Sequence, residues 1–179
     1  MRVCIDAGHG GKDPGAVHGG IKEKDLNLKA ALKLKALLQT AKVDVLLSRE
    51  GDNDVALGGR TGMANAHEVD LFISIHANAS PSALPYGVQT YIYSKETRKL
   101  IGDAVQAEME KVYNQDSEWN RVIDGPGLYV LKRTKCPAIL IEMGFMTNKA
   151  DLKKLTSEKY IPELMQGVAK AVSSLAKKN

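Results

Sequence analysis

The sequence predicts an α/β protein: one domain over residues 1–179, with a twisted, mostly parallel sheet of about six strands flanked by helices. Three short apolar runs, at 3–5, 71–75 and 138–141, have the composition of buried parallel strands. Stretches with helical periodicity alternate with the predicted strands, as in other parallel sheets. A length of 179 residues, 44% of them hydrophobic, suits a single core.

Composition limits the functional classes. The net charge of +4 is compatible with a mild preference for a polyanionic surface such as a cell wall, and equally with a solvated basic face. Aromatic residues make up only 5% of the chain, and no basic and aromatic pattern predicts nucleic-acid binding. No apolar run is long enough to cross a membrane. Cys4 and Cys136 stand in apolar stretches, which favours reduced, buried thiols over a disulfide.

The amino terminus enters the first strand at once, without the charged region, apolar core and cleavage site of a secretory leader. This predicts either a protein that is made and held in the cytoplasm or a catalytic domain taken from a longer secreted chain.

The first strand, residues 3–5, ends in a glycine-rich loop that holds His9 between two glycines. Glycines let the backbone come close to whatever the imidazole binds, and ligands bind at the carboxyl ends of parallel strands. A phosphate loop is excluded, because neither G-x-x-x-x-G-K-[ST] nor G-x-G-x-x-G is present. His9 is therefore either a metal-ligand candidate or an incidental histidine in a turn.

A helix is predicted over residues 25–39, with leucines at helical spacing and Asp25 or Asn27 as its cap. Glu23 directly precedes it. Its carboxylate either interacts with the helix dipole or reaches the same place as His9. His18, in the loop between them, is predicted to be an ordinary loop side chain.

The other elements are recognised by apolar periodicity and by their boundaries of glycine, proline and polar residues. They are, in order, a strand over 43–48, a glycine-containing weak helix over 56–66, a strand over 87–93, an amphipathic helix over 95–113, a polar loop over 114–127, a short strand over 128–131, a short helix capped by Thr147 or Asn148, and a terminal helix over 159–177.

Polar groups follow the two remaining strands. The strand at 71–75 ends in His76 and Asn78, so a second histidine occupies a position equivalent to that of His9. The strand at 138–141 ends in Glu142. Burying an unpaired carboxylate is costly, so Glu142 is either a salt-bridge partner or a group for proton transfer beside a metal. Arg60, on the weak helix, is predicted to be a structural ion-pair partner.

Four motifs in this order resemble the zinc-dependent N-acetylmuramoyl-L-alanine amidases of the amidase-3 type, which are bacterial and phage cell-wall hydrolases. They are Ile5-Asp-Ala-Gly-His-Gly-Gly with Gly15-Ala16, Glu23-Lys-Asp-Leu-Asn-Leu, Ser74-Ile-His-Ala-Asn, and Leu140-Ile-Glu-Met-Gly-Phe with Asn148. The resemblance covers essentially the whole chain.

The resemblance implies one Zn²⁺ bound by His9, Glu23 and His76, and Glu142 as the catalytic acid–base residue. Two imidazoles and one carboxylate leave a fourth position for water, as in catalytic zinc sites. The implied reaction is hydrolysis of the amide between N-acetylmuramic acid and the L-alanine of the stem peptide in peptidoglycan. Asn78 is a candidate substrate-binding residue, and a monomer is expected.

Two alternatives remain open from the sequence. A zinc exopeptidase would need an arginine in the cleft for a peptide carboxylate, and the candidates are Arg49, Arg60, Arg121 and Arg133. A non-catalytic wall-binding relative would lack a ligand or the glutamate, and neither is missing. Some relatives carry a helical insertion that blocks the zinc. Here residues 94–127 are used up by one helix and a loop, which predicts an open cleft.

Overall fold

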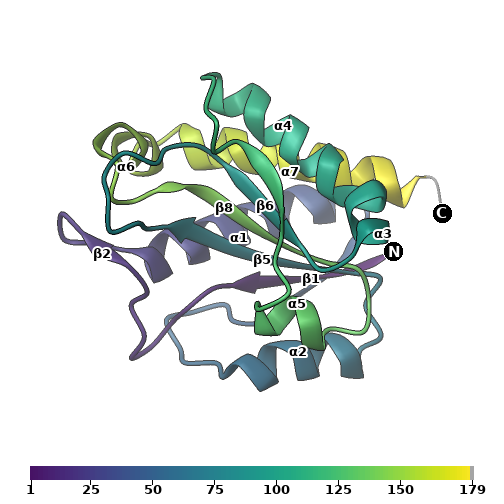
Figure 1. Ribbon diagram of the computed structural model, residues 1–179. Coiled ribbons are helices and arrows are strands. Elements are labelled where there is room, and N and C mark those ends of the chain that lie inside the picture. Colours follow the sequence, from purple (N-terminus) through teal and green to yellow (C-terminus); the bar gives the residue numbers. More distant parts are fainter. Residues whose placement is uncertain (178–179) are drawn as a thin grey trace.

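A twisted six-stranded sheet forms the centre of the computed structural model, which describes residues 1–177 (Figure 1). All neighbouring pairs are parallel except β8 with β6. This confirms the predicted α/β class and the mostly parallel sheet. Across the sheet, the strands are β4 (Asp44–Leu47), β1 (Arg2–Ala7), β5 (Leu71–Asn78), β8 (Ala138–Phe145), β6 (Gln89–Ile92) and β7 (Arg121–Asp124).

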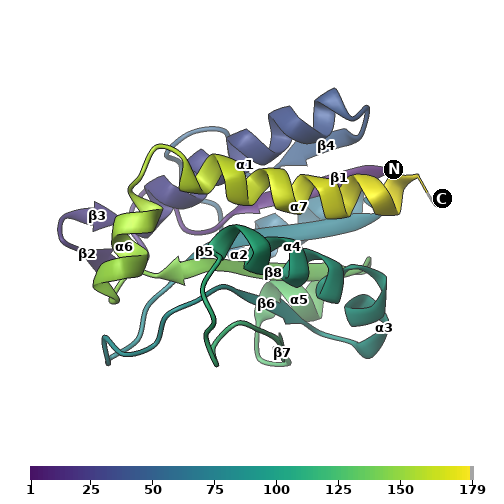
Figure 2. The same cartoon turned by 90° about the horizontal axis from the view of Figure 1, so that it is seen from above.

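Helices cover both faces of the sheet (Figures 1 and 2). The larger core lies between one face and α1 (Glu23–Thr40), α4 (Asp103–Tyr113) and α7 (Tyr160–Ala176). The smaller core lies on the other face beneath α2 (Leu57–Ala66) and α5 (Tyr129–Arg133). Side chains of successive strand residues point to opposite faces, so β1 contributes to both cores and is almost wholly buried. Its carboxyl end is thereby fixed in position.

Two predictions in the second half of the chain are wrong. Residues 121–124, predicted as part of a polar loop, form the edge strand β7, because Val122 and Ile123 pair with the edge of β6 that β8 leaves open. Residues 128–131, predicted as a strand, instead enter the helix α5, which buries Val130 and Leu131 against the smaller core. A short apolar run fits either structure, and its tertiary partner decides between them.

Smaller differences concern helix ends. Helix α1 begins at Glu23, and neither Asp25 nor Asn27 caps it; the N-cap is Lys22, which makes no side-chain capping bond. The helix predicted over 95–113 consists of α3 (Lys95–Thr97), a π-helical turn η1 (Arg98–Gly102) and α4. Asn148 caps α6 (Lys149–Leu155), as predicted, by accepting hydrogen bonds from two backbone amides. The loop after His9 contains a short hairpin of β2 (Val17–His18) and β3 (Ile21–Lys22).

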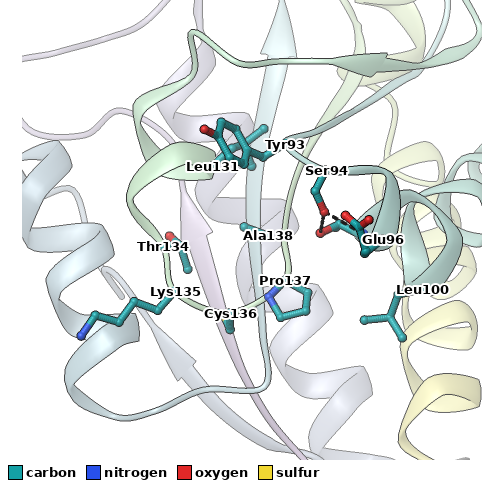
Figure 3. A pocket seen from close by; sticks show the side chains of 11 residues that line it. Tyr93, Ser94, Glu96, Leu100, Leu131, Thr134, Lys135, Cys136, Pro137 and Ala138 are labelled. Atoms are coloured by element: carbon teal, nitrogen blue, oxygen red, sulfur yellow. Dashed lines mark hydrogen bonds between the residues drawn. The ribbon is translucent and has the colours of Figure 1, made fainter.

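Both cysteines have free thiols. Cys4 is buried in the smaller core, and burial raises its pKa to about 12. Cys136 is only partly buried and lines a hollow of about 500 Å³ between Leu131, Pro137 and Ser94 (Figure 3). Burial also raises its pKa, to about 11. Both thiols therefore stay protonated at neutral pH, and a protonated thiol is a poor metal ligand. No helix within the described residues is long and apolar enough to span a membrane.

Candidate metal centre

His9 lies directly after β1, in a loop whose glycines make room for other site residues. A Cβ atom on Gly8 would collide with the imidazole of His76. A Cβ atom on Gly15 would lie 2.6 Å from Cδ2 of His9, and the backbone of Gly15 is left-handed, with φ of 64°. The glycines thus permit the close approach that the sequence predicts.

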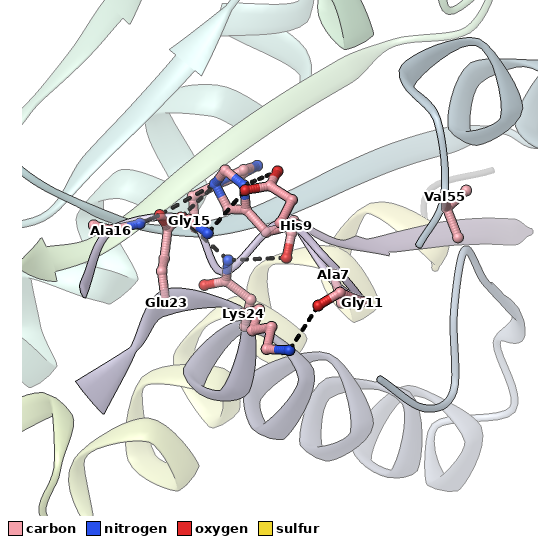
Figure 4. A network of polar contacts seen from close by, with 12 residues as sticks. Ala7, His9, Gly11, Gly15, Ala16, Glu23, Lys24 and Val55 are labelled. Atoms are coloured by element: carbon pink, nitrogen blue, oxygen red, sulfur yellow. Dashed lines mark hydrogen bonds and ion pairs between the residues drawn. The ribbon is translucent and has the colours of Figure 1, made fainter. Parts of the chain in front are cut away.

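The structure brings His9, Glu23 and His76 together (Figure 4 shows His9 and Glu23). Nε2 of His9 lies 3.1 Å from Oε2 of Glu23, and Nδ1 of His76 lies 2.8 Å from Oε1. One donor atom from each residue falls within 4.8 Å of the others. Two imidazoles and one carboxylate at this spacing suit a tetrahedral zinc ion. The imidazoles are partly exposed while Glu23 is buried, so the cluster is open on one side.

Further polar groups orient these three side chains. Oδ2 of Asp13 lies 2.7 Å from Nδ1 of His9, which turns Nε2 toward Glu23. The backbone N–H of Ala16 donates to Oε2 of Glu23, and Nδ2 of Asn27 donates to Oε1. A carboxylate on the far nitrogen of a ligating histidine is a common support in metal sites. The sequence reasoning missed Asp13 and Asn27, although Asp13 lies in the same loop as His9.

Electrostatics couple the three groups. The hydrogen bond with Glu23 raises the pKa of His9 to about 9; burial opposes this shift, and the contact with Asp13 adds to it. Burial alone would raise the pKa of Glu23, but the hydrogen bonds from His76 and His9 outweigh it and hold that pKa well below the usual range. Without a metal, His9 is therefore protonated at neutral pH, and Glu23 is ionised.

Zinc affinity is expected to rise with pH, because His9 must release its proton before the nitrogen can bind a metal. Below the His9 pKa of about 9, each pH unit should strengthen binding by up to about tenfold. Competition with a chromophoric chelator over a pH series measures this slope. Asp13→Asn should lower the pH at which this slope levels off, since it removes one group that raises the His9 pKa. Affinity independent of pH would contradict this assignment.

Glu142 lies beside the cluster, on β8 directly opposite His76 of β5. No lysine or arginine within residues 1–177 forms an ion pair with it, and its Oε2 is shielded from solvent without a hydrogen-bond partner. Burial raises the pKa of Glu142 well above the ordinary value, and the negative charge of Glu23 adds to the effect. The alternative of a structural salt bridge is therefore not realised. Arg60 instead pairs with buried Asp6 at 2.6 Å, as its structural interpretation predicts.

The other candidates occupy different positions. Asn78 follows His76 on β5, but both ends of its side chain are engaged: Nδ2 donates to Oε1 of Gln89, and Oδ1 accepts from the N–H of Ala79. His18 is exposed on the β2–β3 hairpin and is not part of the cluster. Asn78 is thus held beside the site, whereas His18 stays an ordinary surface residue.

A hollow of about 520 Å³ opens beside the two histidines, between the amino-terminal ends of α2 and α5. Exposed Leu57 and Tyr129 lie on its two walls. The imidazoles of His9 and His76 line this hollow and remain 25% and 20% exposed, so the cluster is accessible from it.

An α/β sheet that brings two histidines together with a glutamate from the first turn of α1, partly open to solvent, has the donor set of a candidate metal centre in a hydrolase of the α/β class. Residues 3–174 match the family described as N-acetylmuramoyl-L-alanine amidase. The chain belongs to this family, as an amidase-3-type catalytic domain.

Individual relatives agree. The chain is 36% identical to an endolysin of Bacillus phage SPP1, over 97% of this chain and 65% of that protein. It is 33% identical to the N-acetylmuramoyl-L-alanine amidase LytC of Bacillus subtilis, over 93% of this chain and 34% of that protein. The structure of an N-acetylmuramoyl-L-alanine amidase from Clostridium difficile 630 superposes with a TM-score of 0.92 at 32% identity, covering 99% of this chain and 97% of that one. The chain thus spans about a third to two thirds of these two curated relatives.

Proposed function

We propose that the domain hydrolyses the amide bond between N-acetylmuramic acid and L-alanine in peptidoglycan, with one zinc ion held by His9, Glu23 and His76. The observation that carries the proposal is the open cluster of these three ligand-type residues with the unpaired Glu142 beside it. Membership of the amidase family supports the choice of bond. The place of action is then the bacterial cell wall, in line with relatives named as an endolysin and an N-acetylmuramoyl-L-alanine amidase.

The chain's own residues supply binding and proton transfer. When bound, zinc polarises an amide carbonyl and lowers the pKa of a water molecule. Glu142 takes a proton from the attacking water and delivers it to the leaving nitrogen of L-alanine. Its shielded position raises its proton affinity, which suits it to hold that proton between the two steps. Asp13 and Asn27 keep His9 and Glu23 oriented.

A digest of purified peptidoglycan, analysed by mass spectrometry, tests the reaction. The expected products are glycan strands with intact lactyl carboxylates and stem peptides with a free L-alanine amino terminus. Peptides cut at an internal bond, with the muramoyl amide left intact, would instead show a peptidase.

Three of the four candidate arginines of the exopeptidase alternative are engaged elsewhere, whereas Arg121 is exposed in the row of Glu142 and Gln89, so the digest decides between the two activities. Arg49 donates to the carbonyl oxygens of Ala7 and Gly8, and Arg60 is engaged by Asp6 and by three backbone carbonyls. Arg133 lies at the carboxyl end of α5, with its guanidinium over the ring of Tyr129. A non-catalytic role is not favoured, because every ligand-type residue and Glu142 are in place.

The purified domain is expected to cleave peptidoglycan without an activator protein. The segment that could cover the site, residues 94–127, forms α3, η1, α4 and β7. Helix α4 packs with α7 on one face of the sheet, whereas α2 and α5, which border the hollow beside the histidines, lie on the other face (Figure 2). Turbidity loss of purified cell walls measures the activity, with a zinc-chelated sample as the control. A domain that stays inert until another protein is added would contradict this expectation.

A further inference from the structure

One row of side chains crosses four strands and connects the candidate metal centre to the edge of the sheet. His76 of β5 is paired with Glu142 of β8, Glu142 with Gln89 of β6, and Gln89 with Arg121 of β7. Paired residues of neighbouring strands point to the same face. With strands roughly 4.8 Å apart, Arg121 is therefore attached roughly 10 Å from Glu142, on the same face.

The side chain of Arg121 rests on an aromatic support. Its guanidinium carbon lies 5.1 Å from the centroid of the Trp119 ring. Trp119 meets Phe145 edge to face, with centroids 6.1 Å apart, and Phe145 is paired with Asn78 at the end of β5. Trp119 and Phe145 therefore connect Arg121 to the end of β5, two residues from His76.

Hydrogen bonds hold the segment that carries Trp119 against the start of β6. Oδ1 of Asn120 accepts from the N–H of Val88 at 2.9 Å, and the hydroxyl of Ser117 donates to the carbonyl of Tyr86. Gly87 leaves no room for a Cβ atom, which would collide with Asn120. Trp119 and Arg121 are thus held against the start of β6 before any ligand arrives.

Arg121 is a cation without a carboxylate partner within the described part of the chain, and its side chain is exposed. The hollow on the other side of the histidines has the opposite character. It contains the carboxylates of Asp13 and Asp54, and the guanidinium of Arg60 in its wall is fully engaged. A substrate arm that carries a negative charge is therefore attracted to Arg121 and repelled by the hollow.

We propose that Arg121, supported by Trp119, binds a carboxylate on the second residue of the stem peptide and thereby favours substrates that carry this group. The inference rests on the proposed amidase function. An extended residue spans at most about 3.6 Å, so a carboxylate on the residue after L-alanine lies roughly 7 Å from the scissile nitrogen. The backbone positions of Glu142 and Arg121 lie roughly 10 Å apart, and the two side chains are long enough to bring their charged ends to that spacing. The hollow between α2 and α5 is left for the uncharged muramoyl side.

The test compares two synthetic N-acetylmuramoyl-L-alanyl peptides that differ only in whether the second residue carries a carboxylate or the corresponding carboxamide. The wild-type protein is expected to cleave the carboxylate substrate with a higher kcat/KM. Arg121→Gln should lower that value about tenfold, mainly through KM, and leave the carboxamide substrate almost unchanged. Arg121→Lys should keep part of the preference, and added salt should weaken it. Arg98→Gln changes an exposed arginine on η1, outside this row and outside the hollow, and is the control that should change neither value.

The results distinguish the role of Arg121 from the proposed amidase function. Equal cleavage of both substrates by the wild type, or an equal loss on both in Arg121→Gln, would overturn the role of Arg121 and leave the amidase function intact. A zinc-loaded wild type that cleaves neither substrate and no peptidoglycan would overturn the proposed function and the inference together.

Discussion

Glu142→Gln is expected to yield a folded protein with normal zinc content and at least about a hundredfold lower turnover. Glutamine keeps the shape of the side chain but cannot accept and return a proton. Oε2 of Glu142 has no hydrogen-bond partner, and the pKa of the group is already raised, so a neutral side chain removes an unfavourable charge from a shielded place. The melting temperature should therefore stay the same or rise.

Three measurements on one preparation check this expectation: amide hydrolysis, zinc content by elemental analysis, and thermal unfolding. Glu158→Gln is a matched control, because Glu158 is exposed and distant from the site in the fold. Full activity in Glu142→Gln, or a loss of activity that only accompanies unfolding, would return Glu142 to a structural role.

His76→Ala is expected to lose both zinc and activity. The substitution removes one of three ligand-type groups and also the hydrogen bond that stabilises the ionised form of Glu23. Buried Glu23 is then left with His9 and three weaker donors, so the pKa of its carboxyl should rise toward the ordinary value. A catalytic zinc site requires three protein ligands, and this variant keeps only two.

Elemental analysis after gel filtration measures the zinc that is retained. His18→Ala is the control, since this histidine is exposed on the β2–β3 hairpin and should leave zinc and activity unchanged. Full zinc in the His76→Ala protein would show that the ligand set is wrong.

The sequence is informative where a local pattern decides the outcome. His9 follows β1, whereas β5 and β8 extend beyond their predicted ends and contain His76 and Glu142 in their last four residues. A parallel sheet still places the three residues near one another. The amidase resemblance added Glu23 and the division of roles. The fold class and the residues of the candidate centre could therefore be predicted from the sequence.

What the sequence could not supply depends on pairing between distant segments. Residues 121–124 become a strand only because the edge of β6 is open, and α5 forms only because the smaller core accepts Val130 and Leu131. The row from His76 to Arg121 requires the register of three strand pairs. The contact of Asp13 with His9 depends on a left-handed backbone at His9 itself, with φ of 60°.

The three ligand-type residues come from the end of β1, the first turn of α1 and the end of β5, which are neighbours in the fold. A zinc ion bound there would link these elements and oppose their local opening. Hydrogen exchange of the amides in β1, β5 and the first turns of α1 should therefore slow on zinc loading and recover with a chelator. The edge pair β6–β7 holds no ligand, so its exchange should be the same in both states. Peptide-resolved exchange would thus reveal occupancy of the centre without any substrate.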